Sequence, residues 1–330
     1  MFTSKKSIYI AIILLLVAFG GAHAVANNQA NRTAAELVNE LVSKINENGG
    51  DVEVGEVTGN PYNKNITVKD ILVTDELGRQ HQIGMLTLSD IELNPEQDFI
   101  YAMNIATVDA RYKVTGGDGT SEQEQALADT LQSIGIQQER IGHDQRLAYR
   151  YQPLERQLSL NLQNQFYNPE QSNKADAQLF SLNMQTLFSQ IPDLENQLQR
   201  LRNNEDMSTA SAEWMQTGLI AAEIDFEDRG AWQPFIKQAA QQAGISEVEL
   251  KAQLKQQMQQ QVAALQTVWP ELHTQLTDAA VTFIDSDTPR LVMDINSKNP
   301  QGTGLMLAFM SVLMSPTSVA GYFDIQLTAE

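Results

Sequence analysis

Cysteine is absent from this chain of 330 residues. No disulfide can therefore stabilise the fold, and a lipid anchor attached to a cysteine is excluded. The burial of apolar side chains must hold the fold together. A chain of this length can bury a sizeable core, in one large or two medium domains.

Positive charge is scarce, with 22 lysines and arginines against 41 aspartates and glutamates and a net charge of −19. The first 26 residues carry two lysines and no acid, so the remainder has a net charge of −21. The densest basic pair is Arg200 with Arg202. A chain this acidic is repelled by nucleic acid and by anionic membrane surfaces. We therefore expect no nucleic-acid partner.

Recognisable catalytic, metal and cofactor motifs are also absent. The histidines beyond residue 26 are His81, His143 and His273, and none has a second His, a Cys or paired carboxylates at metal-ligand spacing. The chain has no glycine-rich phosphate-binding motif and no G-x-S-x-G nucleophile motif. The sequence therefore predicts no catalytic, cofactor-binding or metal-binding residue, and a protein that is not an enzyme.

Two acidic stretches suggest chemistry at first sight. The segment 281–288 resembles the phosphatase motif of haloacid dehalogenases, but the downstream lysine and acidic pair of that family are missing. We interpret Asp285 and Asp287 as turn residues. Carboxylates alternate in the segment 223–229, as in a glycosidase, but a solvated strand face that runs into a helix cap at Asp228 is the commoner structure.

The N-terminus has the pattern of an export signal. Two lysines in residues 1–6 precede an apolar run at 8–19 and a series of small residues. A bilayer crossing needs about 20 apolar residues, so this length favours a signal peptide (residues 1–26), cleaved after Ala24 or Ala26. The alternative is an uncleaved anchor that associates residues 7–26 with the inner membrane. Either form places the remaining chain outside the cytoplasm.

Residues 27–115 are predicted to form an N-terminal helix and an antiparallel β region. The strands 66–73 and 86–93 match each other, and in each the alternation of apolar residues slips by one at an aspartate, Asp70 or Asp90. A slip of one residue turns the following side chains to the other face of the sheet. We therefore predict β-bulges at Lys69–Asp70 and Ser89–Asp90, and a curved sheet. Chance similarity between two amphipathic strands is the alternative.

Residues 121–330 are predicted to form an α+β domain with a β-meander and amphipathic helices, after a glycine-rich linker at 115–121. Ser246 and Glu249 form the pattern of a capping box that opens a long helix, and Pro270 kinks this helix or begins a new one. The other expected elements are a helix at 122–134; strands at 104–114, 146–152, 157–166, 175–187, 218–226, 290–297 and 322–329; and helices at 194–201, 231–243 and 250–269. The fold class is α+β, with curved antiparallel β-sheets and a helical C-terminal region.

The segment Leu305–Met314 is apolar nearly all round. It is too short to span a bilayer and too apolar for a solvated helix, so it is buried or lines a hydrophobic site. The candidate surface for an apolar ligand or partner consists of Leu305, Leu307, Phe309, Met310 and Leu313.

Several segments resemble known envelope proteins. The segments Val57–Asn60 and Ile66–Ile71 resemble the start of the AsmA-like and YdgA-like proteins of proteobacteria. The meander at 131–160, and Phe226–Gly230 with the helical stretch after it, are similar to the YdgA-like group. The resemblance covers most of residues 30–285. It implies a periplasmic, inner-membrane-associated protein without an established activity, and its AsmA-like side implies lipid transport along a hydrophobically lined sheet. This chain has too few strands for a long groove.

Together these observations predict a non-enzymatic protein of the periplasm with a binding or scaffolding role, and an envelope protein as its partner. The first alternative is a carrier of a lipid or another apolar ligand, built on the sheet and on Leu305–Met314. The second is an envelope hydrolase, which would need a solvent-open pocket that joins two acidic residues with shifted pKa values.

Overall fold

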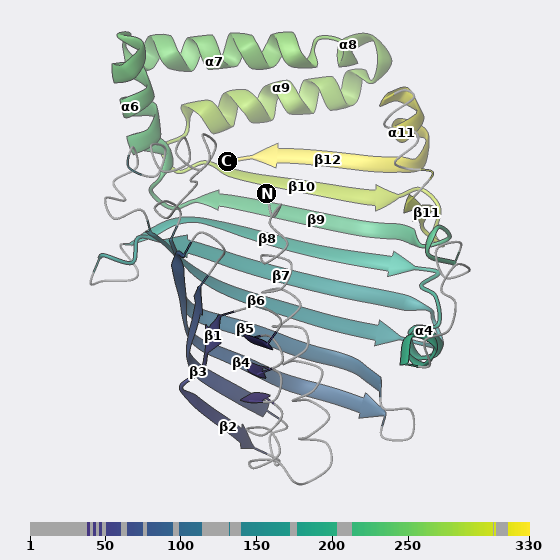
Figure 1. Ribbon diagram of the computed structural model, residues 1–330. Helices are drawn as coiled ribbons and strands as arrows, with labels where there is room; N and C mark the ends of the chain where they lie inside the picture. Colours follow the sequence, from purple (N-terminus) through teal and green to yellow (C-terminus); the bar gives the residue numbers. More distant parts are fainter. Residues whose placement is uncertain are drawn as a thin grey trace. The chain divides into compact units, whose positions relative to one another are not determined.

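A computed structural model describes most of the chain, and Figure 1 shows its elements. The described residues are 38–39, 42–43, 46–47, 51–60, 65–74, 78–94, 99–113, 132, 140–171, 177–202, 213–305, 307 and 316–330. The predicted export signal, the linker at 115–121 and the helix predicted at 122–134, apart from residue 132, lie outside them.

The strands belong to one large antiparallel sheet, in the order β1-β3-β4-β5-β6-β7-β8-β9-β10-β12, with β2 paired to β3 and β11 to β9. One sheet replaces the several sheets that the sequence suggested. Every predicted strand is present. The strands are β1 (Val52–Glu53), β2 (Glu56–Asn60), β3 (Asn65–Thr74), β4 (Gln80–Asn94), β5 (Phe99–Lys113), β6 (Arg140–Gln152), β7 (Gln157–Tyr167), β8 (Gln178–Ser189), β9 (Gly218–Asp228), β10 (Arg290–Ser297), β11 (Thr303–Gly304) and β12 (Phe323–Ala329).

The labelled helices lie in the C-terminal half, so the mixed α+β class is confirmed. They are α4 (Leu194–Arg202), α6 (Trp232–Ala243), α7 (Glu247–Val262), α8 (Leu265–Val268), α9 (Pro270–Asp285) and α11 (Pro316–Tyr322). Near the N-terminus, the described residues 38–39, 42–43 and 46–47 are helical, as predicted. Within the described residues, no helix is both long enough and apolar enough to cross a membrane.

The chain divides into two compact units. Unit 1 comprises residues up to 149 together with 164–179, and unit 2 comprises 150–163 together with 180–330.

The core of unit 1 lies on one face of its strands. Val38 from the N-terminal helix is buried in it, and the Asn46 side chain exchanges two hydrogen bonds of 2.9 Å with the backbone of Val52. These contacts attach the helix to the start of the sheet. The other buried members are Val52, Ile66, Val68, Ile71, Val73, Ile83, Leu86, Leu88, Ile91, Ile100, Met103 and Ala110.

The predicted slip of the buried face is confirmed in both strands. In β3, Ile66 and Val68 are buried before Asp70, and Ile71 and Val73 are buried after it. Asp70 has a φ of 55°, in the left-handed region. In β4, Asp90 has a φ of 52° and occupies the same place in the repeat. The similarity of the two strands is therefore structural and not a coincidence.

The mechanism differs between the two aspartates. At Asp90 the ladder with β5 shifts between Ser89 and Glu92, which confirms a bulge. At Asp70 the predicted bulge is wrong, because the pairs Lys69–Met85 and Ile71–Ile83 keep one register. One residue in the left-handed conformation turns the following side chains of β3 to the other side of the sheet without an inserted residue. Gly55 gives this conformation room, since a Cβ there would lie 2.9 Å from the Cβ of Asp70.

Helix α7 of unit 2 begins where the sequence predicted, but it ends before the predicted residue. Ser246 and Glu249 form the predicted capping box at the start of α7. The expected continuous helix to Trp269 is wrong, because α7 ends at Val262 and a short α8 follows. Pro270 is the first residue of α9, which is the second of the two predicted outcomes and a position where its missing N–H costs nothing.

Candidate functional site

Four neighbouring strands of unit 2 have one apolar and one polar face. The pairing places Met184, Ile224, Met293 and Leu327 side by side across β8, β9, β10 and β12. The next row, from Asn183 and Asp225 to Val292 and Thr328, points to the other side of the sheet. We call the first side the apolar face. It consists of Leu182, Met184, Ile224, Phe226, Leu291, Met293, Ile295, Ile325 and Leu327.

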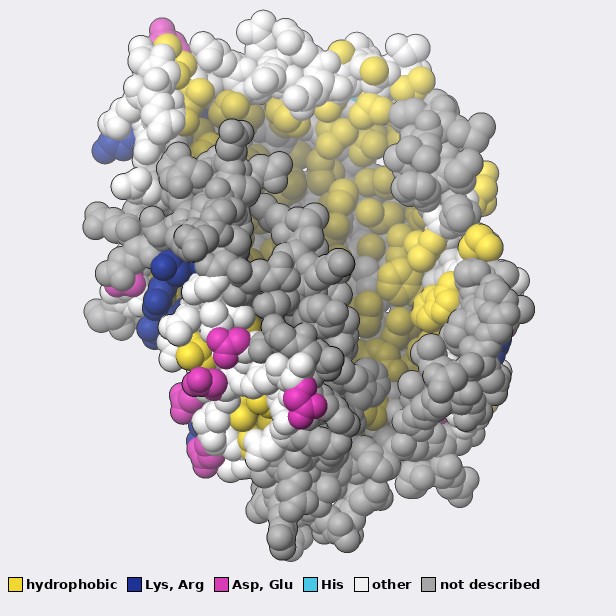
Figure 2. Space-filling model, in the orientation of Figure 1, with side chains coloured by type: hydrophobic (Ala, Val, Ile, Leu, Met, Phe, Trp, Pro, Cys, Tyr) yellow, Lys and Arg dark blue, Asp and Glu magenta, His cyan; other side chains and the backbone are white. Residues whose placement is uncertain are grey.

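The apolar face is incompletely covered. All nine of its side chains are only half-buried, whereas the equivalent face of β3 and β4 in unit 1 holds fully buried residues. Figure 2 shows hydrophobic side chains gathered over these strands in a hollow beneath α7 and α9. A sheet that packs its whole apolar side into a core would leave no such surface.

Aromatic rings close one end of the apolar face. The Phe226 ring lies 5.9 Å from Phe180 on β8 and 5.9 Å from Phe283 on α9, between ring centroids. Trp232 at the start of α6 meets Phe283 edge-on at 5.2 Å. These rings join the sheet to both helices, and Ile236 of α6 is fully buried. The rings pack together over this end of the face, which we call the closed end.

Asp228 fixes the closed end. Its buried carboxylate accepts hydrogen bonds from the backbone N–H groups of Gly230, Ala231 and Trp232, which is the strand-to-cap junction predicted from sequence. Burial raises the pKa of Asp228, and the three N–H donors oppose that shift. The carboxylate supplies acceptors that the first turn of α6 would otherwise lack.

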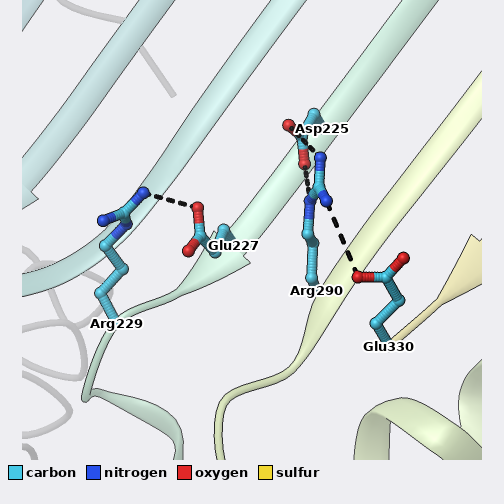
Figure 3. Close-up of polar contacts among 5 residues, drawn as sticks. All are labelled: Asp225, Glu227, Arg229, Arg290 and Glu330. Atoms are coloured by element: carbon cyan, nitrogen blue, oxygen red, sulfur yellow. Dashed lines mark hydrogen bonds and ion pairs between the residues drawn. The ribbon is translucent and has the colours of Figure 1, made fainter.

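The polar face of the same strands carries ion pairs, drawn in Figure 3. The Arg290 guanidinium donates to both carboxylate oxygens of Asp225 at 3.0 and 3.2 Å, and it lies 3.7 Å from Glu330. Arg229 donates to Glu227 at 2.6 Å. The alternating carboxylates therefore form a strand face paired with arginines, as part of the polar side of the sheet.

Helix α9 is tied to the sheet and to α7 by polar contacts at its margins. The Gln275 side chain accepts a 3.0 Å hydrogen bond from the N–H of Leu327 on the edge strand β12. Lys255 of α7 pairs with Asp285 at 2.6 Å, and Gln233 donates to Asp287 at 2.8 Å. Asp287 lies in the turn after α9, which confirms its interpretation as a turn residue, whereas the same interpretation is wrong for Asp285, the last residue of the helix.

The predicted candidate surface is only partly described. Leu305 and Leu307 are both exposed, so the alternative of a buried core position is wrong for these two. The Leu305 N–H donates to the carbonyl of Thr217 at 2.8 Å, which places it beside the start of β9, opposite the aromatic end. Phe309, Met310 and Leu313 lie outside the described residues.

Unit 1 holds a separate polar cluster around Asp109 on β5. Its carboxylate accepts from Arg111 at 3.1 Å and from the Tyr167 hydroxyl at 3.0 Å, and its N–H donates to Asp144 at 2.8 Å. Burial and the bond to Asp109 raise the pKa of Tyr167. Asp109 has a φ of 56° opposite Gly84, so the cluster holds a third left-handed aspartate in place. Its evident role is structural.

The described residues also bear on hydrolytic and metal chemistry. Burial raises the pKa of Asp228 and hydrogen bonds from Ser246 lower the pKa of Glu249, and both carboxylates accept from backbone N–H groups at the starts of α6 and α7. Among the same residues, no group of three or more His, Asp or Glu side chains could hold a metal ion.

Sequence reasoning missed the apolar face as a unit. The alternation of Leu291, Met293 and Ile295 was readable, as was that of Ile325 and Leu327. No local signal shows that these strands are neighbours in register, because their partners are fixed by contacts between distant parts of the chain.

Comparison with known proteins adds a family without a known activity. Residues 175–330, which include β9, β10, β12 and the four helices α6 to α9, match the model of a family described as an uncharacterized protein. No curated protein matches the chain.

Proposed function

We propose that this protein binds an apolar, chain-like ligand, such as a lipid acyl chain, on the apolar face of unit 2. It does so outside the cytoplasm, in the periplasm, and without catalysis. The observation that carries the proposal is the only half-buried state of nine adjoining apolar side chains on four paired strands. Contiguous exposed apolar patches are uncommon on monomeric proteins and mark sites of interaction.

The dimensions of the face support an acyl chain. Side chains on one face of a strand repeat every ~6.7 Å, so Leu291 and Ile295 are separated by ~13 Å. Four strands at a spacing of ~4.8 Å give a width of ~14 Å. One leaflet of a bilayer provides about 15 Å of hydrocarbon depth, which is the reach of one acyl chain. The face therefore has the length to lie along a single chain.

The chemistry of the face also supports a ligand without polar groups along its length. A protein–protein interface carries about one hydrogen bond per 100–200 Å², so a surface that binds a protein has to present hydrogen-bond donors and acceptors. The paired rows of the apolar face carry no charged side chain between Leu291 and Ile295. Charged groups are gathered on the opposite side, around Asp225 and Arg290.

Two features of the sequence agree with this proposal. The predicted export signal at residues 1–26 would bring unit 2 to a compartment where envelope lipids are accessible. The resemblance to AsmA-like and YdgA-like proteins implies lipid contact along a hydrophobically lined, curved sheet. Among the strands of the apolar face, the ladder between β8 and β9 shifts between Leu187 and Phe188, and an irregularity of this kind is a means of such curvature.

The test compares two adjacent residues of β10 that point to opposite sides. Met293→Gln puts an amide on the apolar face, and Val292→Gln puts the same amide on the polar face. Both side chains are half-buried in the free protein. A buried amide without a partner costs about 1–3 kcal/mol, so Met293→Gln should weaken binding of palmitate by about 5- to 150-fold. Val292→Gln should bind palmitate like the wild type.

Palmitate affinity is measured by titration calorimetry, and circular dichroism checks that both variants are folded. Mass spectrometry of an organic extract of the wild-type protein supplies a second readout, since a bound envelope lipid would be carried through purification. Equal affinities for the two variants, or a wild type that neither binds palmitate nor carries lipid, would refute the proposal. Binding of a protein partner to the same face would then be the better interpretation.

A further inference from the structure

We propose that the ligand of the apolar face is an uncharged acyl ester, bound with its hydrocarbon chain toward the closed end and its carbonyl oxygen on the hydroxyl of Thr186. This inference rests on the proposed function, and it names the class and the direction of the ligand. A group of hydroxyls on the same side of the sheet carries it. We call this group the hydroxyl end, and it consists of Thr186, Thr217, Ser297 and Thr303.

Strand register places Thr186 at the border of the apolar face. Thr186 pairs with Ala222 on β9, and Ala222 pairs with Ile295 on β10, which is a member of the apolar face. Met184, another member, lies two residues before Thr186 on β8. Side chains two residues apart on a strand point to the same side of the sheet, so the Thr186 side chain shares the side of the nine apolar ones.

The other hydroxyls follow along the same side, away from the closed end. Ser297 lies two residues after Ile295, and its hydroxyl is bonded to the hydroxyl of Thr303 at 2.7 Å. Thr303 pairs with Leu219 on β9. Thr217, two residues before Leu219, continues this ladder, because its carbonyl accepts the backbone N–H that follows β11 at 2.8 Å. Hydroxyl groups thus enter this side of the sheet where the purely apolar rows end.

Two of these hydroxyls are shielded from water and unsatisfied. The Oγ1 atoms of Thr186 and Thr217 have no hydrogen-bond partner among the residues that the structure describes. Such a hydroxyl has lost its hydrogen bonds to water without replacing them, which costs free energy. A ligand oxygen would recover this loss. Thr186 is the hydroxyl in place to do so, because it adjoins the apolar rows, whereas Thr217 lies beyond Leu219.

The charges around the face favour an uncharged ester over a carboxylate or a phosphate, which proteins usually bind with arginine or lysine. The strands β8, β9, β10 and β12 carry one basic residue, Arg290, and its guanidinium is bound to Asp225 on the polar face. Lys298 follows Ser297, so alternation turns it to the other side, and its ammonium donates to the carbonyl of Ala320 at 2.7 Å. The net charge of −19 further opposes an anionic ligand.

The direction of the ligand follows from the difference between the two ends of the face. The rings around Phe226 at the closed end suit a methyl terminus, which needs no hydrogen bond. Thr186 and Leu182 are ~13 Å apart along β8, and an acyl chain extends over about 15 Å, so the chain fits between the carbonyl and the rings. The indole N–H of Trp232 at the closed end also lacks a partner among the described residues, so the experiment has to distinguish the two directions.

Two lipids that differ at the carbonyl test the proposal on the full chain. Glycerol monopalmitate carries the carbonyl oxygen, and glycerol monohexadecyl ether has a methylene in its place with the same chain length and head group. Thr186→Val removes the hydroxyl and keeps the shape of the side chain. It should weaken binding of glycerol monopalmitate by about 2- to 12-fold, the range of one neutral hydrogen bond, and leave binding of the ether unchanged.

Two further variants serve as controls. Thr186→Ser keeps a hydroxyl and should keep the preference for the ester. Thr328→Val makes the same substitution at an exposed residue on the polar face of β12, and it should bind both lipids like the wild type. Affinities are measured by titration calorimetry below the concentration at which either lipid aggregates, and circular dichroism checks that each variant is folded.

Three outcomes overturn the inference. Thr186→Val binds glycerol monopalmitate as tightly as the wild type does, or it loses affinity for both lipids alike. Trp232→Phe abolishes the preference for the ester instead, which means that the ligand lies in the opposite direction. The wild type binds palmitate at least as tightly as glycerol monopalmitate, which keeps the apolar site and refutes the uncharged ester. A wild type that binds none of the three ligands refutes the proposed function itself.

Discussion

Replacing Asp70 by valine tests whether a single left-handed residue sets the facing of β3. Asp70 is exposed and has a φ of 55°. Ile66 and Val68 before it and Ile71 and Val73 after it are buried in the same core. Valine is β-branched and strongly disfavours this conformation. The variant must either hold valine in the left-handed region or let β3 return to regular alternation.

The magnitudes decide between these outcomes. The left-handed conformation costs an ordinary residue with a Cβ about 1–2 kcal/mol, a cost that aspartate largely avoids because its short polar side chain can hydrogen-bond locally. Regular alternation would turn Ile71 and Val73 out of the core, at about 1.5–3 kcal/mol for each side chain. The strained conformation is therefore the less costly one, and Asp70→Val should keep its fold and lose about 1–2 kcal/mol of unfolding free energy. Asp70→Gly should lie within about 0.5 kcal/mol of the wild type, because glycine adopts this φ without strain but loses more entropy on folding.

Urea unfolding followed by circular dichroism measures these differences, and thermal unfolding should show a Tm about 2–8 °C lower for Asp70→Val. Thr67→Val is the matched control, because it adds a valine to the same strand at a residue with an ordinary φ. It should change stability by no more than about 0.5 kcal/mol. If Asp70→Val is as stable as Asp70→Gly, the left-handed conformation is not what fixes the facing of β3, and the reasoning fails.

Two further predictions concern unit 1. Gly142→Ala should destabilise the protein by about 1–3 kcal/mol in urea unfolding, because a Cβ there would lie 2.6 Å from Cζ of the Tyr167 ring. Adding Tyr167→Leu to this variant should recover part of the lost stability. If the losses of the two substitutions simply add, the two residues are not packed against each other in this way. Burial lowers the pKa of His143, which stacks on Phe166 at 4.5 Å, so the folded protein favours the neutral ring. The stability that the neutral His143 ring contributes is then fully present above the ordinary pKa of 6.5, and it is lost as the pH falls through the lower pKa of the folded protein. Unfolding free energies between pH 8 and pH 5 should fall less steeply for His143→Gln than for the wild type, and parallel curves would contradict the assignment.

Local patterns predicted much of the fold. The alternation of apolar residues in β3 and β4, with its slips at Asp70 and Asp90, located the buried face, because every second side chain of a strand points to the same side of the sheet. The pair Ser246 and Glu249 located the start of α7, because its two hydrogen bonds join residues only three apart. Interruptions were harder to predict. The break after Val262 had no marker comparable to the proline at 270.

The candidate site depended on contacts that no local pattern contains. The sequence indicated that β10 and β12 alternate, but only the register Met293–Leu327 and Met293–Ile224 makes one apolar face from separate strands. Leu305 and Leu307 were candidates from composition alone, and their exposure beside β9 could not be read from it.

The sequence by itself thus determined the elements, their buried sides and the absence of disulfides, because propensity, periodicity and capping act over a few residues. The tertiary structure decided how those sides meet. It replaced the bulge expected at Asp70 by a left-handed residue, because Gly55, between β1 and β2, leaves space for it. It also decided that the face around Met293 stays half-covered, since coverage depends on where α6 and α9 pack and not on the strand that they cover.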